Sequence, residues 1–205
     1  VGTDSRIGEK FLNAGPGFGG SCFKKDILNL VYLCNYYGLN EVASYWENIV
    51  NINDWQQKRI SKLIVKNLFG TISDKRIALL GFSFKSNTND TRESPTINIS
   101  RHLFQEDAKL SFYDPQVKKD QIIKEFQDEY YHQGSLEVCE SALEACKNSD
   151  AVIISTEWDE FKYLDWEAIF KVMRKPAWVF DTRICLKKNH LKNIGFKVWT
   201  LGSSG

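Results

Sequence analysis

A glycine-rich segment leads directly into a cysteine, two lysines and an aspartate. It reads Gly15-Pro16-Gly17-Phe18-Gly19-Gly20-Ser21-Cys22-Phe23-Lys24-Lys25-Asp26, and an apolar run follows it. That run predicts a helix from about Asp26 to Tyr37, so we expect Cys22 near a helix N-terminus. There, unpaired N–H groups, the helix dipole and a nearby lysine favour the thiolate, which is the reactive form of cysteine. Because Lys25 and Asp26 follow three and four residues later, they can share one face with Cys22. The segment therefore predicts a nucleophilic cysteine beside a cation and a carboxylate.

Two other interpretations of this segment have to be weighed. Gly15, Gly17 and Gly20 match the dinucleotide pattern G-x-G-x-x-G, but that pattern requires a preceding strand, and Arg6–Leu12 is a poor one. A plainer possibility is a glycine turn before a core helix that buries the cysteine, since free cysteines are commonly buried. The segment by itself leaves the catalytic and the buried cysteine both open.

The composition is that of an ordinary globular protein. The chain has 205 residues, a hydrophobic fraction of 42% and a formal net charge of +1. This balance gives no electrostatic reason to expect nucleic acid or membrane as a partner, and no apolar run approaches the length of a membrane span. The five cysteines are scattered and odd in number, which argues against a disulfide framework and a metal site and fits the cytoplasm. Since no methionine opens the chain, we expect a fragment of a longer protein.

The first part, residues 1–72, is predicted to be helical. After a stop at Gly38, Asn40 is expected to cap a helix that no glycine or proline interrupts between Glu41 and Phe69. Such a helix spans about 40 Å. Its apolar residues form a wider stripe than one packing partner needs, so it is either buried on two sides by its own chain or part of a subunit interface.

The second part, residues 73–205, alternates strands and helices. Apolar runs predict strands at Arg76–Phe82, Lys109–Tyr113, Ala151–Ile154, Trp178–Phe180 and Lys197–Trp199, and capped helices begin after Ser94, Ser141 and Asp165. Phe126–Gly134 is expected to be a loop or a weak helix. This alternation predicts an α/β fold: a helical region with a long central helix, followed by a doubly wound, mostly parallel, Rossmann-like sheet.

Side chains that could contact a ligand, most of them polar, follow several of these strands. Phe84, Lys85 and Arg92 come after the first strand, Thr156 and Glu157 after the third, and Arg183 after the fourth. Basic groups at the carboxyl ends of parallel strands suit a phosphate-bearing ligand, although a solvated rim of ion pairs would have the same composition. Only Gly81 follows the first strand, so a dinucleotide is not expected on this sheet.

The motifs named above resemble those of a known family. Gly17–Asp26, then Gly81-Phe82-Ser83-Phe84-Lys85 with Thr88 and Asp90–Ser94, then Thr156-Glu157-Trp158, resemble the nucleotide-sugar dehydrogenases, and among them the UDP-glucose 6-dehydrogenases. The resemblance runs through essentially the whole chain and keeps the order of its two parts. The motifs are specific for the group and select UDP-glucose among the sugars less firmly.

The resemblance implies an enzyme that oxidises UDP-glucose to UDP-glucuronate with NAD as cofactor. Similar enzymes have an N-terminal NAD domain, a central helical region and a C-terminal UDP-binding domain. Residues 1–72 would then be the central, dimerising region with the cysteine loop, and residues 73–205 the UDP-sugar-binding domain, with the NAD domain outside this chain. A homodimer or higher homo-oligomer is implied as well.

Site residues carried over from the family fall into three groups. Cys22 matches the nucleophile, whose thiohemiacetal loses hydride to leave a thioester, and Asp26 matches a carboxylate that assists with a water or proton. Cofactor-side positions are Cys22, Phe23, Lys24, Lys25 and Arg92. Substrate-side positions are Arg6, which would reach a neighbouring subunit's sugar, the loop residues Asn13, Ala14, Gly15, Pro16, Gly17, Phe18 and Gly19, and Phe84, Lys85 and Arg183. No metal is implied.

One departure and two alternatives remain. Asn13 stands where many relatives have lysine, which puts one substrate contact in doubt. The sugar could be a UDP-N-acetylhexosamine or GDP-mannose instead of UDP-glucose. The chain could also be a module that binds a nucleotide sugar, or only oligomerises, without chemistry.

Overall fold

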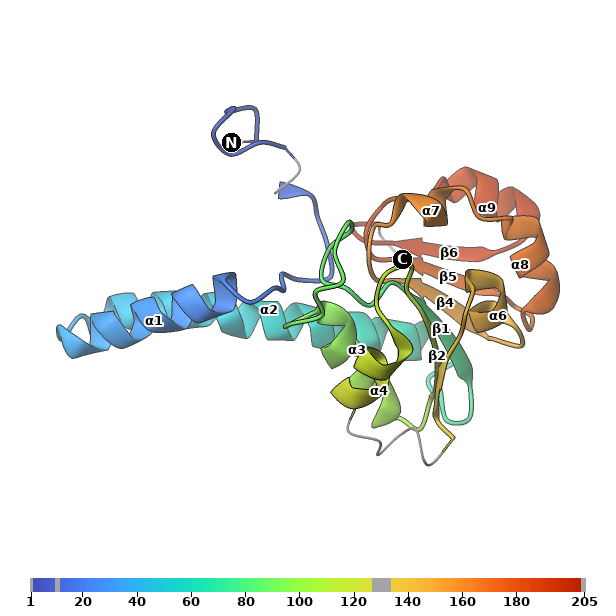
Figure 1. The fold of residues 1–205 in the computed structure, drawn as a ribbon, viewed down its shortest axis with the longest axis horizontal. Helices are drawn as coiled ribbons and strands as arrows, with labels where there is room; N and C mark the ends of the chain where they lie inside the picture. Colours follow the sequence, from blue (N-terminus) through green and yellow to red (C-terminus); the bar gives the residue numbers. More distant parts are fainter. Residues whose placement is uncertain (1, 10–11, 127–133, 204–205) are drawn as a thin grey trace.

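The structure, a computed structural model, describes residues 2–9, 12–126 and 134–203. A helical hairpin made of α1 (Phe23–Tyr36) and α2 (Asn40–Asn67) projects from an α/β unit that contains a six-stranded sheet (Figure 1). α2 has 28 residues and is therefore about 42 Å long. The predicted combination of a helical region, a long central helix and a Rossmann-like sheet is confirmed.

The hairpin begins earlier in the sequence than expected. α1 starts at Phe23, not Asp26, so Cys22 occupies the N-cap position itself. The turn at Gly38, whose φ is +74°, is so short that Leu39 already accepts the first hydrogen bond of α2, from the N–H of Ala43 at 2.9 Å. The prediction that Asn40 caps α2 is therefore wrong, because Asn40 already lies inside the helix.

All six strands are parallel. Their order is β3-β2-β1-β4-β5-β6, so the chain reverses its direction of growth between β1 and β4. The predicted strands all form, two with the predicted bounds and three with ends shifted by one or two residues. The strands are β1 (Arg76–Leu80), β2 (Lys109–Tyr113), β3 (Leu136–Val138), β4 (Ala151–Ile154), β5 (Trp178–Asp181) and β6 (Lys197–Thr200).

Helices cover both faces of the sheet, because successive strand residues point to opposite sides. Ile77 and Leu79 of β1 face one core, which α2 shares with α3 (Pro95–Phe104) and α4 (Lys119–Glu125). Ala78 and Leu80 face a second core, beneath α6 (Ala142–Cys146), α7 (Asp159–Lys162), α8 (Trp166–Val172) and α9 (Lys188–Ile194). Both faces are apolar, which explains why the central strands β1 and β4 consist almost entirely of hydrophobic residues.

The two halves of α2 have different surroundings. Its second half lies in the sheet's core, where Ile60, Ile64 and Leu68 are no more than 2% exposed. Its first half pairs with α1 and leaves large side chains uncovered, with Tyr45 66%, Ile52 63% and Trp55 61% exposed. Burial by its own chain, one of the two alternatives predicted from the wide apolar stripe, therefore describes the second half of α2. The other alternative, a subunit interface, suits the uncovered first half.

The structure contains elements that the sequence does not predict, namely β3, α4, α7 and α9. Most of the segment Phe126–Gly134, expected to be a loop or a weak helix, lies outside the described residues. Within the described residues, no helix has the length and apolar character needed to cross a bilayer.

Candidate active site

The loops that follow β1 and β4 touch at the point where the sheet reverses. The Thr156 hydroxyl donates a hydrogen bond to the Ser83 carbonyl at 2.6 Å. Gly81 ends β1 with a φ of +96°, and a Cβ placed there would lie 2.5 Å from the Cβ of Thr156. Only glycine fits this close approach. Parallel sheets of this kind bind their ligands at such a reversal point.

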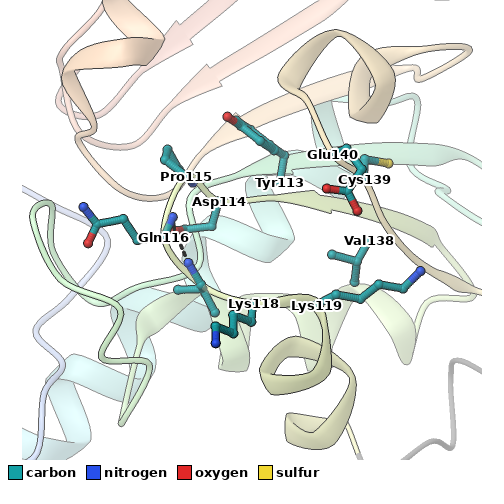
Figure 2. A pocket seen from close by; sticks show the side chains of 10 residues that line it. Tyr113, Asp114, Pro115, Gln116, Lys118, Lys119, Val138, Cys139 and Glu140 are labelled. Atoms are coloured by element: carbon teal, nitrogen blue, oxygen red, sulfur yellow. Dashed lines mark hydrogen bonds between the residues drawn. The ribbon is translucent and has the colours of Figure 1, made fainter.

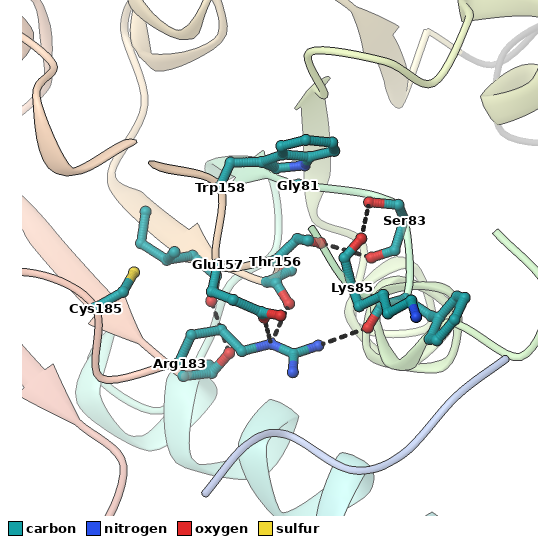
Figure 3. A network of polar contacts seen from close by, with 12 residues as sticks. Gly81, Ser83, Lys85, Thr156, Glu157, Trp158, Arg183 and Cys185 are labelled. Carbon is teal, nitrogen blue, oxygen red and sulfur yellow. Dashed lines mark hydrogen bonds and ion pairs between the residues drawn. The ribbon is translucent and has the colours of Figure 1, made fainter. Parts of the chain in front are cut away.

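Arg183, which follows β5, is fixed across the ends of three strands (Figure 3). Its Nε donates to Ser155 O at 2.7 Å and its Nη2 to Phe84 O at 3.1 Å, while Glu157 forms an ion pair with Nε at 3.2 Å. The side chain is 13% exposed. Burial lowers the pKa of Arg183, and the Glu157 carboxylate opposes that effect. These contacts use Nε and Nη2, and no hydrogen bond from Nη1 is found among the described residues.

The glycine loop of residues 13–20 lies against this arginine and the β1 loop. A Cβ on Gly15 would be 3.2 Å from Arg183 Nη1, and the loop's blue trace passes below Arg183 in Figure 3. A Cβ on Gly19 would lie 2.4 Å from the carbonyl oxygen of Glu93, and Gly20 donates its N–H to Arg92 O at 2.8 Å. The glycines are needed because side chains would push the loop away from the strand ends.

Cys22 follows this loop and is exposed at the start of α1. The Ser21 hydroxyl lies 3.7 Å from its Sγ. The cysteine is also near the Arg92 guanidinium: the Asp90 carboxylate chiefly raises the pKa of Arg92, and Cys22 adds a smaller contribution in the same direction. Since α1 contains Lys25 and Asp26 in its first turn, the predicted spacing of both from Cys22 along one helix face is present.

Three of the other four cysteines have a raised pKa, which makes their thiols poor nucleophiles. Burial raises the pKa of Cys139 to about 11 and that of Cys185 to about 12, and it also raises the pKa of Cys146. Cys34 is buried, and none of the five is in a disulfide. Because the thiolate is the nucleophile, Cys22 is the cysteine whose position suits covalent chemistry.

In a comparison with known proteins, the cysteine loop and the strand ends match two domains of the same protein family. The UDP-binding domain of the UDP-glucose/GDP-mannose dehydrogenase family matches residues 78–188, and the family's central domain matches residues 1–55. The chain belongs to this family. In this UDP-glucose/GDP-mannose dehydrogenase family member, the loop that leads to Cys22 lies in the part that matches the central domain. Phe84 and Arg183 lie in the part that matches the UDP-binding domain.

Individual relatives extend over nearly the whole chain. The chain is 49% identical to UDP-glucose 6-dehydrogenase 4 of Arabidopsis thaliana, with 98% of this chain and 45% of that protein covered. It is also 49% identical to the UDP-glucose 6-dehydrogenase of Gallus gallus, covering 98% of this chain and 42% of that protein. A solved structure of a UDP-glucose dehydrogenase from Pyrobaculum islandicum superposes with a TM-score of 0.73 at 27% identity, covering 96% of this chain and 42% of that one. The chain thus spans less than half the length of these relatives.

Most of the site residues predicted for this chain lie close together in the structure. Gly15–Gly19, Phe84 and Arg183 are neighbours, and Phe23 packs edge-on against Phe18, with ring centroids 4.7 Å apart. Lys24 forms a 2.8 Å ion pair with Glu93. Lys85 is exposed, with its Nζ 5.3 Å from the centre of the Phe84 ring.

Other predicted residues lie outside this group. Arg6 is exposed and forms a 2.7 Å ion pair with Asp4, in an N-terminal segment that stands apart from the sheet in Figure 1. Asn13 and Ala14 are exposed where the loop begins, and Pro16 is buried within it. The site within one chain is therefore centred on the loop, the ends of β1 and β5, and the start of α1.

The sheet itself does not fit NAD, although its strand order is the one found in dinucleotide-binding sheets. In those sheets an acidic residue after the second strand binds the ribose, and a glycine-rich turn after the first takes the pyrophosphate. Here Asp114 follows β2, but its carboxylate already accepts five hydrogen bonds of 2.7–3.1 Å, from the N–H groups of Phe82, Ser83, Gln116 and Val117 and the indole of Trp158. The hollow beside it, about 380 Å³, lies between Lys118 and Cys139 at the ends of β2 and β3 (Figure 2).

A metal-like cluster outside the site was not anticipated from the sequence. The ligand atoms of Glu137, Cys139 and Glu144 lie within 4.8 Å of one another. Arg76 already forms a 2.6 Å ion pair with Glu137, and burial keeps the Cys139 thiol protonated. Arg76 therefore offsets the charge of one of the two carboxylates, and the cysteine is not in the thiolate form that binds a metal.

Three amide side chains near the loop also went unpredicted. Asn53 and Gln57 of α2 are buried beneath Phe18 and Gly17, and Asn98 of α3 donates to Gln57 at 2.8 Å. The available signal was the spacing of Asn53 and Gln57 with Val50, Ile60 and Ile64, which puts amide side chains in the buried stripe of α2.

Proposed function

We propose that the chain carries the catalytic cysteine and the UDP-sugar site of an NAD-dependent UDP-glucose 6-dehydrogenase. The proposal depends on one observation above the others. The glycine loop that leads to Cys22 lies against Phe84 and Arg183, at the ends of β1 and β5. A substrate held at the strand ends would therefore meet the nucleophile from the neighbouring loop. The high identity to UDP-glucose 6-dehydrogenases supports UDP-glucose as the substrate.

Arg183 and Lys85 are the groups that would hold the nucleotide part. Arg183 is fixed in place before any ligand arrives, so its Nη1 donor, which donates no hydrogen bond within the described part of the chain, costs little entropy to use. Guanidinium donors match phosphate oxygens well, and Lys85 adds a second cation at the same strand ends. Residues 13–19 would wrap the sugar, because the loop passes close to Nη1 at Gly15.

Cys22 would carry out the second half of the oxidation. The C6 alcohol first loses hydride and a proton to become an aldehyde. The Cys22 thiolate then adds to the aldehyde carbon, and protonation of the oxygen gives a thiohemiacetal. Loss of a second hydride and a proton leaves a thioester, and water releases the carboxylate and restores the thiol. Asp26, one turn into α1, would take a proton from that water.

NAD supplies the hydride-accepting chemistry in this proposal, and it binds outside this sheet. Phe23, Lys24 and Lys25 follow Cys22 at the start of α1, and Arg92 lies near it. All four would face the cofactor. The relatives contain more than half of their length beyond the matched part, which leaves room for an NAD domain. Residues 1–72 would form the central region and residues 73–205 the UDP-sugar-binding domain, with α2 joining them.

We also propose a homodimer or higher homo-oligomer in the cytoplasm. The uncovered first half of α2, with Tyr45, Ile52 and Trp55, is an apolar surface of the kind that subunits bury. Arg6, which stands away from its own sheet, would then reach a neighbour's sugar site. Five cysteines without a disulfide suit a reducing compartment.

The test replaces Cys22 in the whole protein. Cys22→Ser should lower UDP-glucuronate formation from UDP-glucose and NAD at least about a thousandfold, because serine is a far weaker nucleophile. UDP-glucose binding, measured by calorimetry, should remain. The matched control is Cys185→Ser, which changes a cysteine near Arg183 and should keep the activity. A Cys22→Ser enzyme with the normal rate would show that Cys22 is structural.

A substrate panel separates the sugar from the chemistry. The wild-type enzyme should oxidise UDP-glucose faster than a UDP-N-acetylhexosamine or GDP-mannose. Faster oxidation of either alternative would keep the role of Cys22 and change the substrate. The 205-residue chain by itself should produce no NADH, because its sheet does not fit the cofactor. NADH formation by the chain alone would contradict that assignment.

A further inference from the structure

Asn53 is one of three polar residues, with Gln57 and Ser61, in the mainly apolar buried stripe of α2. It is 8% exposed, and Gln57, one turn later, is 2% exposed, between Val50 on one side and Ile60 and Ile64 on the other. A buried amide without partners costs about 1–3 kcal/mol, so such a residue needs hydrogen bonds to be tolerated. An apolar side chain would serve packing equally well at this position. The partners of Asn53 therefore indicate what the residue is for.

Those partners are both backbone groups of a single loop residue. Asn53 Oδ1 accepts the N–H of Phe18 at 2.8 Å, and Asn53 Nδ2 donates to the carbonyl of Phe18 at 3.2 Å. A planar amide offers one donor and one acceptor side by side, which a carboxylate or a hydroxyl does not reproduce. The pair fixes both the position and the orientation of the Phe18 peptide groups.

The loop lies so close to this amide that a side chain at Gly17 would not fit. Gly17 has a φ of +135°, and a Cβ on it would lie 2.7 Å from Asn53 Oδ1 and 3.1 Å from Gln57 Nε2. On the other side of the loop, Gly20 donates to Arg92 O. The loop is thus held between α2 and the segment that follows β1.

The amide contacts also continue to the sheet. Gln57 Oε1 accepts a 2.8 Å hydrogen bond from Asn98 of α3, the helix that follows the Lys85–Glu93 segment. Cys22 comes four residues after Phe18, and the Phe18 ring packs against Phe23. Whatever fixes Phe18 therefore fixes the start of α1.

We propose that Asn53 is a positioning residue, whose side-chain amide holds the Phe18 backbone and so sets Cys22 relative to Arg183 and Phe84. The inference rests on the proposed function of Cys22. Asn53 itself touches no reacting atom in this assignment, and its effect passes through the loop. If Asn53 only stabilised the fold, its replacement would weaken the protection of the loop and of the core of α2 equally.

Hydrogen exchange in the whole protein distinguishes these roles without any activity. Asn53→Ala should raise amide exchange in the peptide covering residues 13–21 roughly tenfold, while amides around Ile60 and Ile64 keep their protection. Asn51→Ala, an exposed asparagine on the same helix, is the control and should change neither. Unchanged exchange in the loop would overturn the proposal.

A second variant keeps the test decisive if alanine prevents folding. Asn53→Asp has the same size and keeps the acceptor for the Phe18 N–H, but it cannot donate to the Phe18 carbonyl. It should give exchange between wild type and Asn53→Ala, and a loop as protected as in wild type would count against the bidentate role.

Kinetics complete the experiment. In Asn53→Ala, kcat should fall about a hundredfold, as expected when a reacting group is misplaced by an ångström, and KM should rise by a smaller factor. A change in KM alone would assign Asn53 to substrate binding and overturn the positioning of Cys22. If the wild type lacked UDP-glucose oxidation, the proposed function would fail, and the exchange result would still decide the role of Asn53.

Discussion

At the scale of single residues, Asp114 organises the strand ends more than any charged group in the site. It lies at the end of β2 and is 8% exposed, yet its donors come from the β1 loop, its own turn and Trp158 after β4. Its oxygens are therefore shared among three neighbouring strand ends. A carboxylate that would hold a ribose in a dinucleotide-binding sheet here holds the loop that carries Phe84 and Lys85.

Asp114→Asn should consequently destabilise the protein and weaken nucleotide binding. Whichever oxygen becomes an NH₂ group, at least two N–H donors would face another donor. We expect a loss of about 2–3 kcal/mol in the free energy of unfolding, measured in urea, and weaker UDP binding by calorimetry. Asp120→Asn, at an exposed position on α4, is the control. Unchanged stability in Asp114→Asn would mean that the loop does not depend on this carboxylate.

Cysteine reactivity is a second property decided residue by residue. Burial raises the pKa of Cys139 to about 11 and that of Cys185 to about 12, so both thiols are protonated at pH 8. Because Cys22 is the exposed cysteine, iodoacetamide should modify it first, as followed by peptide mass spectrometry. Faster labelling at Cys139 or Cys185 would contradict the burial described for those thiols.

At the scale of elements, the contact between α2 and α3 places a histidine among charges of both signs. Burial lowers the pKa of His102 on α3 below its ordinary value of 6.5, Lys58 and Lys62 of α2 add to that effect, and Asp54 opposes it. The folded protein therefore binds the His102 proton less tightly than the unfolded chain does. The stability that results is complete above pH 6.5 and is lost as the pH falls through the folded-state pKa.

His102→Gln should remove this part of the acid sensitivity. Urea unfolding at about pH 7.5 and about pH 5.5 should show a smaller loss of stability on acidification in the variant than in wild type. His190→Gln, at an exposed position on α9, should leave the wild-type loss unchanged. An equal loss in wild type and His102→Gln would show that the α2–α3 contact does not disfavour the histidine proton.

At the scale of the whole molecule, the hairpin presents the surface that a second copy would cover. Replacing Trp55, which is 61% exposed, with glutamate places a charge in that surface without touching either core. Light scattering at micromolar concentration should show a dimer or larger assembly for wild type and a smaller species for Trp55→Glu. Tyr163→Glu, 85% exposed beyond α7, should assemble as wild type does. A wild-type monomer would contradict the proposed oligomer.

The sequence predicts the parts of this molecule whose pattern is local. β4 is an unbroken apolar run and β2 is rich in apolar and aromatic residues. Ser141 and Asp165 accept the cap hydrogen bonds that their residue types suggest. β3 was missed because three residues, one of them the outward-facing Glu137, are too short a pattern to recognise. α4 and α9 were missed because each buries a single side chain, Ile122 and Leu191 respectively.

The site divides in the same way. The glycine loop, Cys22 and the strand-end residues are visible as motifs, because their chemistry depends on residues adjacent in sequence. Asn53 acts on a loop that lies 35 residues away along the chain. A polar residue in an apolar stripe reveals that something must contact it, but the partner depends on tertiary structure.

α2 finally sets both the distance and the relative orientation between the glycine loop and the sheet. It contacts the loop through Asn53 and Gln57 and enters the sheet's core three residues later at Ile60. Inserting one residue between Gln57 and Ile60 would turn one set about 100° away from the other. Inserting seven would restore the direction to within about 20° but separate the two sets by a further 10 Å or so. We therefore expect this stretch of the gene to tolerate substitutions but no change of length, so that insertions and deletions are confined to the loops on either side.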